Sequence, residues 1–302
     1  MTTHAHTEGR SAGALVPPGA VVAGLDELTG ATAALDWAVD EALLRGRPLV
    51  LVHALDPEGS RSVARAESAR LLDDATAHVR HRAGPSLDLH RHVAEGDPTE
   101  LLVTLSSGAC AIVLGSRGRG AIRSTVLGSV SVGVSKQAAC PVIVHRPHAH
   151  PGLVRHGVAV GSSATGHSPH TLAFAYDAAS LRGWPLTVIH AVWDSEAMVN
   201  TPHLVTGAAL LRLESERLQV AEAMAGLAEE HPDVRARVLV ARGRPEECLT
   251  SLGARMHLLV VGREGPPRRL SRATAVSVVE SSDCPVAVVP SLSRSTTERN
   301  PS

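Results

Sequence analysis

The sequence has few aromatic residues, almost no net charge and no long apolar run. Phe, Trp and Tyr make up 2% of its 302 residues, so the cores must be aliphatic, and the stacking rings that single-stranded nucleic acid readers need are scarce. A net charge of -1 leaves no general basic field for DNA or an anionic membrane. No apolar run reaches the roughly 18 residues of a membrane span, and residues 1–18 lack a signal peptide's apolar segment. We expect a cytoplasmic protein.

Cysteine and histidine are present, but not in metal-binding patterns. The cysteines form no CxxC pair and no zinc spacing, so we expect small buried hydrophobes. They stand at positions 110, 140, 248 and 284. Four histidines, at 145, 148, 150 and 156, share one short stretch, but Pro147 and Pro151 mark it as a connector. We predict solvated histidines there and no metal site.

The chain repeats itself. A shift of 137 positions lays Gly24 on Gly161 and His53 on His190, and a shift of 147 superposes Gly115 on Gly262. A shift of 144 aligns the two Cys-Pro pairs at 140 and 284. Changes in the offset indicate insertions and deletions in surface loops. The chain is therefore a duplication of one domain.

In each half, apolar runs alternate with amphipathic stretches, which predicts a parallel sheet covered by helices. In the first half we expect strands near 19–25, 48–55, 87–94, 110–115 and 141–146, and helices near 30–46, 60–83, 97–108 and 127–138. In the second we expect strands near 157–161, 185–192, 234–241, 257–262 and 285–290, with a long helix over 204–230. The prediction is an α/β fold: two tandem doubly wound five-stranded domains of strand order 3-2-1-4-5.

This pattern also gives the domain boundaries. We expect a first domain over 18–147 and a second over 156–290, joined by a linker at 148–155. The ends, 1–17 and 291–302, are rich in Ser, Thr, His and Arg and are predicted to be disordered tails.

A glycine motif follows the apolar run at 110–114. It consists of Gly115-Ser-Arg-Gly118, nine residues, and then Gly128-Ser129. Glycines let backbone N–H groups approach an anion closely, and a helix opening at Gly128 adds the positive end of its dipole. Arg117 lies inside the glycine frame and is a candidate phosphate ligand, although a solvated loop arginine is an equal alternative. The motif predicts a nucleotide ligand.

The rest of such a site is expected where the strand order reverses, between the first and fourth strands. Asp26 follows the first strand and can accept hydrogen bonds from a ribose hydroxyl or a base amine. The second strand ends at His53-Ala54, which can offer backbone groups to a base edge. His53 itself is predicted to be a packed strand residue.

On these residues, from about 18 to 290, the chain resembles the universal stress protein family as a tandem of two such domains. Gly115, Gly118, Gly128 and Ser129 reproduce the family's G-x2-G-x9-G-[ST] signature. The resemblance implies an adenine nucleotide alpha hydrolase-like fold and ATP as ligand, with or without Mg2+. It implies the ligand residues Asp26, Ala54, Gly115, Arg117, Gly118, Gly128, Ser129, Val130 and Ser131. It also implies pairing through the fifth strands, between two chains or between the halves of one chain.

The second half departs from this pattern. Ser163 replaces Asp26, Pro266 and Pro267 follow Gly265, and no Gly-Ser pair opens the last helix. Since proline withdraws N–H donors, we predict that the second domain binds ATP poorly or not at all.

Three functions stay open on the sequence. The first is a nucleotide-responsive regulatory protein in stress tolerance, with ATP in the first domain only and no catalytic residue. The second is a slow ATP hydrolase that uses Asp26 to hold Mg2+, and the third is a scaffold that binds no nucleotide. A dinucleotide oxidoreductase is disfavoured, because Gly115, Gly118 and Gly120 give the reverse of the spacing that this fold requires.

Overall fold

The structure is a computed structural model. It describes residues 16–26, 28–55, 61–116, 128–146, 153–162, 169–192, 207–263 and 269–291. The chain divides into two compact units, residues 1–145 and 146–302, and each is described by itself.

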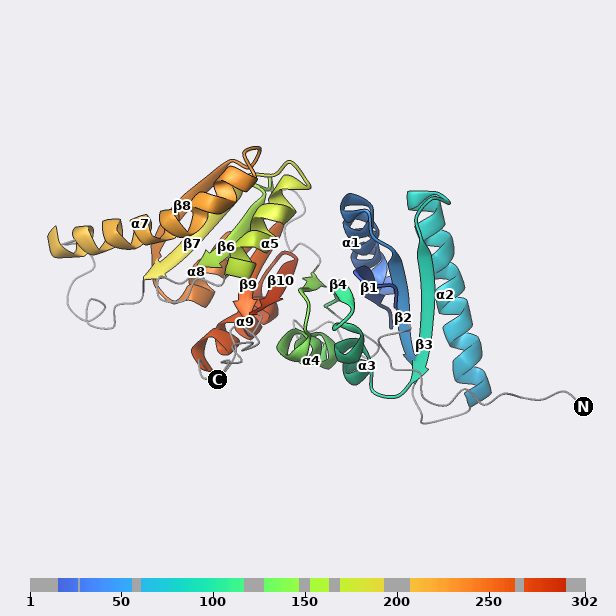
Figure 1. Ribbon diagram of the computed structural model, residues 1–302. Coiled ribbons are helices and arrows are strands. Elements are labelled where there is room, and N and C mark those ends of the chain that lie inside the picture. Colours follow the sequence, from blue (N-terminus) through green and yellow to red (C-terminus); the bar gives the residue numbers. More distant parts are fainter. Residues whose placement is uncertain are drawn as a thin grey trace, which may run out of the picture. The chain divides into compact units, whose positions relative to one another are not determined.

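The first unit alternates strands and helices along its whole length (Figure 1). Its strands are β1 (Ala20–Gly24), β2 (Leu49–Leu55), β3 (Leu89–Glu95), β4 (Ala109–Gly115) and β5 (Val142–His145). Its helices are α1 (Leu28–Arg45), α2 (Arg61–Ala83), α3 (Pro98–Leu105) and α4 (Ser129–Gln137). The strands pair in parallel in the order β3-β2-β1-β4-β5.

The second unit repeats this order. Its strands are β6 (Val158–Ser162), β7 (Leu186–Val192), β8 (Ala236–Arg242), β9 (Leu258–Arg263) and β10 (Val286–Pro290). Its helices are α5 (Pro169–Ser180), α7 (Gly207–Glu230), α8 (Pro245–Gly253) and α9 (Arg269–Ser281). The strands pair in parallel as β8-β7-β6-β9-β10, so the predicted order 3-2-1-4-5 is confirmed in both units.

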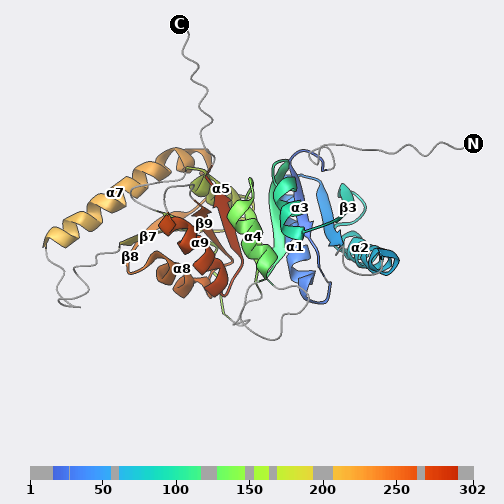
Figure 2. The ribbon, with the colours of Figure 1, turned by 90° about the horizontal axis from the view of Figure 1, so that it is seen from below.

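The helices form two layers on each sheet. Parallel strands are joined by right-handed crossovers, so a reversal of direction after β3 sends the later helices to the other face. In agreement, α1 contacts α2, while α3 lies beside α4, and the second unit pairs α8 with α9 in the same way (Figure 2). The reversal places the carboxyl ends of β1 and β4 side by side at one edge of the sheet.

Aliphatic side chains fill the cores, as the scarcity of aromatic residues predicts. The central strands β1, β2 and β4 carry Val21, Leu51 and Ile112 with no exposed surface. In contrast, the outermost strands β3 and β8 alternate half-buried and exposed residues. Two cysteines follow the prediction, since Cys140 and Cys284 are buried. The prediction is wrong for Cys110, near the start of β4, and for Cys248, within α8, which are only half-buried.

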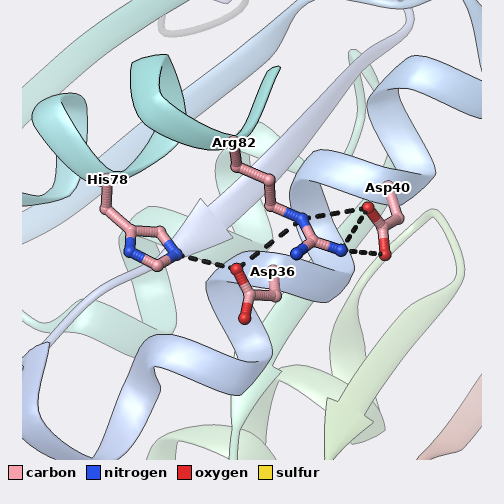
Figure 3. A network of polar contacts seen from close by, with 4 residues as sticks. All are labelled: Asp36, Asp40, His78 and Arg82. Carbon is pink, nitrogen blue, oxygen red and sulfur yellow. Dashed lines mark hydrogen bonds and ion pairs between the residues drawn. The ribbon is translucent and has the colours of Figure 1, made fainter. Parts of the chain in front are cut away.

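Two pairs of polar side chains fasten α2 to α1 (Figure 3). His78 Nε2 lies 2.7 Å from Asp36 Oδ1, and one helical turn further on, Arg82 donates to both carboxylate oxygens of Asp40 at 2.8 Å. Both partners repeat at i, i+4, so the pairs form a ladder along the two helices. The Asp40 carboxylate raises the pKa of Arg82, and we assign this ladder a structural role.

The described part of the chain contains no helix that is both long and apolar enough to cross a membrane. It also holds no cluster of three His, Cys, Asp or Glu side chains arranged for a metal ion.

Candidate functional site

The carboxyl ends of three strands define the candidate site in the first unit. In the register of the sheet, Gly24 of β1 lies beside Val52 of β2 and Leu114 of β4. Asp26, two residues beyond Gly24, is exposed at the same edge as Gly115, the last residue of β4. Three of the predicted elements therefore meet at one edge.

Ala54 lies at this edge on the neighbouring strand. It pairs with Ala94 of β3 on one side, but β1 has ended on the other, where its last register partner is Val52. The side of Ala54 that faces away from β3 therefore has no strand partner among the described residues. This geometry leaves room for backbone contacts to a ligand.

The close approach of β1 to β4 requires glycine at position 24. A Cβ atom built on Gly24 would lie 2.5 Å from Leu114 Cδ2 and 3.3 Å from Leu102 Cδ1 of α3. Such a contact is too short for carbon atoms, so a side chain here would displace both leucines. Gly24 therefore lets α3 pack against the end of β1.

Helix α4 begins with uncommitted backbone donors. Gly128 is its N-cap in an extended conformation, with φ -63° and ψ 140°, and no side chain caps the helix. The first hydrogen bond within the helix runs from Val132 N to Gly128 O, so the N–H groups of Ser129, Val130 and Ser131 have no described acceptor. These three groups and the helix dipole make this end attractive to an anion.

The beginning of α3 differs. There the Asp97 carboxylate accepts from the N–H groups of Thr99 and Glu100 at 2.8 and 2.9 Å, and proline stands at the first helical position. The first N–H groups of α3 are thus paired with a side chain of the same unit, whereas those of α4 have no described acceptor.

Two hydrogen bonds fasten the start of α4 to the end of β4. The Gly128 N–H donates to Ser116 O at 3.0 Å, and the Ser131 hydroxyl, in a buried residue, donates to Gly115 O at 2.8 Å. The chain leaves at Ser116 and returns to the same place at Gly128. The structure therefore brings Gly115, Gly128 and Ser131 together, whereas the predicted ligands Arg117 and Gly118 lie outside the described residues.

His53 is buried, as predicted for a packed strand residue, and it adds a contact that the sequence did not indicate. Its Nδ1 lies 2.7 Å from Leu25 O, the residue before Asp26. Since a carbonyl only accepts, Nδ1 carries the proton and donates. The side chain thus joins the end of β2 to the backbone that carries Asp26, and its role is to position that backbone.

The second unit uses its equivalent histidine differently. His190 Nδ1 lies 3.1 Å from Ser162 O, the counterpart of Leu25, while Nε2 lies 2.9 Å from the Glu216 carboxylate on α7. The repeat of His53 and His190 was visible in the sequence, but the contact to Glu216 was not. That contact joins two residues that lie 26 positions apart along the chain.

The end of β9 also differs from the end of β4. A Cβ built on Gly262 would lie 2.8 Å from Thr171 Oγ1, a buried hydroxyl for which the described residues offer no hydrogen-bond partner. Helices α4 and α9 end at Gln137 and Ser281, which are equivalent positions in the two halves. The same alignment places Ser129, the first residue of α4, opposite Ala273. Helix α9 begins at Arg269, four residues before that position. One extra helical turn therefore occupies positions that in the first unit belong to the chain before Gly128. Ser163, Gly265, Pro266 and Pro267 lie outside the described residues.

Comparisons with known proteins agree with the duplication. The model of the universal stress protein family matches twice, at residues 19–146 and 156–290. A universal stress protein of Mycobacterium tuberculosis is 32% identical over 260 residues, which cover 81% of this chain and 87% of the relative. One of Mycolicibacterium smegmatis is 28% identical over 286 residues, covering 89% and 96%.

The fold agrees as well. The crystal structure of a universal stress protein from Archaeoglobus fulgidus superposes with a TM-score of 0.63 at 17% identity, over 90% of this chain and 96% of that one. Strand order, duplication, glycine motif and these matches lead to one conclusion. The chain belongs to the universal stress protein family, as a tandem of two of its domains with the adenine nucleotide alpha hydrolase-like fold.

Proposed function

We propose that the first domain binds ATP and that occupancy of this site, with little or no turnover, is the regulatory output of the protein in stress tolerance. The observation that carries the proposal is the start of α4. Three consecutive N–H groups without acceptors among the described residues, a glycine N-cap and two hydrogen bonds to the end of β4 support an anion-binding surface here.

The remaining residues take their roles from their places around this surface. The phosphates would contact the N–H groups from Gly128 to Ser131, with Gly115 and Gly118 lining the approach and Arg117 adding charge. The carboxylate of Asp26 would accept from the ribose or the base, and the Ala54 backbone would contact the base edge. A Mg2+ ion would reach the protein through the phosphates, because the described residues offer no cluster of ligands for a metal.

We propose that the second domain binds no ATP. The extra turn of α9, Thr171 against Gly262, and the His190–Glu216 pair all support this asymmetry, because each changes a position that serves the first site. The second domain would then act as a structural partner or as a surface that reports the state of the first.

Thermal melts with and without ATP test the proposal. A ligand at a thousand times its Kd stabilises the folded state by about 4 kcal/mol, which gives a clear shift of Tm. Mass spectrometry of the denatured protein adds a second readout, since a bound nucleotide should copurify. No shift and no released nucleotide would leave the scaffold as the function.

Slow hydrolysis is the second candidate, and Asp26 is the residue that favours it, because a carboxylate beside the phosphates can hold Mg2+. A steady-state phosphate release assay that compares the protein with Asp26→Ala separates it from passive binding. Steady release that the substitution abolishes would make the protein an ATPase; the absence of release leaves occupancy as the output.

Assembly and location complete the proposal. Family members pair through the fifth strand of the sheet, and we propose a homodimer or a pseudo-dimer of the two halves, in the cytoplasm. Light scattering with ATP present and absent distinguishes the two assemblies, and cell fractionation tests the location.

A further inference from the structure

The amino-terminal edge of the second sheet, at the opposite end of its strands from the carboxyl edge, carries a second cluster of polar groups. Residues 155–157 and 255–257 enter β6 and β9 side by side. His156 N donates to Arg255 O, and His257 N donates to Gly157 O, both at 2.8 Å. The Gly157 N–H in turn donates to His257 Nδ1 at 3.0 Å.

Arg155 and His257 carry side-chain donors that no described residue accepts from. Because Nδ1 of His257 accepts a hydrogen bond, the ring proton stands on Nε2, which has no partner in the described part of the chain. Arg155 forms neither a hydrogen bond nor an ion pair with a described residue, and its Nε is buried. Burial, and then the charges of Arg155 and His156, lower the pKa of His257, so the ring is held neutral in positive surroundings.

Among the described residues, none forms an ion pair with Arg155. The Cys284 thiol, on which the charge of Arg155 acts, is buried, and burial raises its pKa to about 11, so it carries no charge near neutral pH. Asp283 acts on the same thiol but forms no ion pair with Arg155. A guanidinium with a buried Nε and no partner is costly, and a bound anion removes that cost.

The wall of the cluster is rigid. Trp184 stacks on His257 with ring centroids 4.3 Å apart and 13° between the planes, and Arg182 covers Trp184 at 5.4 Å. His257 is therefore held against an aromatic surface, and Arg182 adds positive charge beside it. Such preorganisation favours binding because little freedom is lost.

The arginine that covers Trp184 has a counterpart in the first domain. There Arg45 Nε donates to the buried Glu41 carboxylate at 2.5 Å. The offset of 137 aligns Arg45 with Arg182 but Glu41 with Ala178, so the second domain keeps the arginine and lacks that carboxylate.

We propose that Arg155 and His257 form a binding site for an oxyanion, a phosphate or a carboxylate group, at the amino-terminal edge of the second domain. The guanidinium supplies charge and paired donors, and His257 Nε2–H supplies one neutral donor. The site is independent of ATP binding in the first domain.

The test uses the full chain with Trp37→Phe and Trp193→Phe, which leaves Trp184 as the only tryptophan. The protein is titrated with phosphate, acetate and chloride at constant ionic strength, and both Trp184 fluorescence and the NMR signal of His257 Nε2–H are followed. We expect saturable changes with phosphate, with acetate or with both; the anion that saturates at lower concentration identifies the ligand chemistry.

Arg155→Gln should weaken binding at least tenfold, whereas Arg217→Gln, which removes an exposed arginine of α7, should leave it unchanged. Circular dichroism verifies that both variants fold, and Arg155→Lys, which keeps the charge, should retain part of the affinity. Two results overturn the proposal. One is no saturable response in either measurement; the other is an equal response with chloride or in Arg155→Gln, which would mean an adventitious ion only.

Discussion

Replacing Ser129 by proline removes one backbone N–H from the proposed phosphate site and leaves the helix intact. Proline fits the first position of a helix, where the N–H has no partner within the helix. Its predecessor must be extended, and Gly128 already is, with φ -63° and ψ 140°. The chain itself supports the substitution, since α3, α5 and α8 all begin with proline. We therefore expect no loss of stability.

The expected loss is in ATP affinity. A hydrogen bond from an N–H group to a charged oxygen contributes about 1.5–3 kcal/mol, which corresponds to roughly a 10- to 100-fold increase in Kd. Isothermal titration of ATP measures the change, and thermal melts without ATP verify that Ser129→Pro is as stable as the natural chain. Ser129→Ala is the matched control, because it removes the hydroxyl and keeps the N–H.

Two outcomes would refute this reasoning. If the stable Ser129→Pro variant binds ATP as well as the natural chain, the start of α4 does not hold the phosphates. If Ser129→Ala loses as much affinity as Ser129→Pro, the side chain and not the backbone is the ligand.

Three further predictions concern stability. The pKa of Cys284 is raised to about 11 in the folded chain, so between pH 9 and 11 the unfolded chain loses a proton that the folded chain keeps. The free energy of unfolding should therefore fall with rising pH by up to about 3 kcal/mol. Denaturation of Cys284→Ala should not show this loss. Gly157 has φ +89°, and a Cβ there would lie 2.1 Å from Pro185 O, so Gly157→Ala should lower the free energy of unfolding by more than about 3 kcal/mol in urea denaturation. Gly183→Ala is the control and should cost about 1 kcal/mol, because φ is +62° there and the space is open. Arg82→Met should cost less than about 1 kcal/mol, because Arg82 and Asp40 are 39% and 45% exposed, and the loss should vanish in 1 M salt; a cost that persists there would contradict the ladder.

The sequence predicted the elements well because their signals are local. The observed β2 (Leu49–Leu55) and β4 (Ala109–Gly115) lie within one residue of the expected strands, and α2 (Arg61–Ala83) differs by one residue at its start. Apolar runs, a proline at the start of α3 and a glycine after α1 each depend on neighbours along the chain. The repeat supported these assignments, because the same order of elements is expected in both halves.

What the sequence could not predict depends on residues that are distant along the chain. The His190–Glu216 pair and the stack of Trp184 on His257 require the packing of helices and loops against strands. Thr171 is an ordinary polar residue in the sequence, and only the structure shows that its hydroxyl lies against Gly262 near the carboxyl end of β9. Similarly, the half-exposure of Cys110 follows from its position near the start of β4, which composition does not reveal.

The earlier start of α9 has a consequence for how the protein would respond to nucleotide. Twin pockets on a single chain can cooperate and produce a sigmoidal, threshold-like curve. If only the first domain binds nucleotide, as we propose, each polypeptide takes up one molecule of ligand, and a chain that acts by itself saturates as a simple hyperbola. Such a chain reports the concentration of its ligand gradually, and its second half is free to evolve a different specificity.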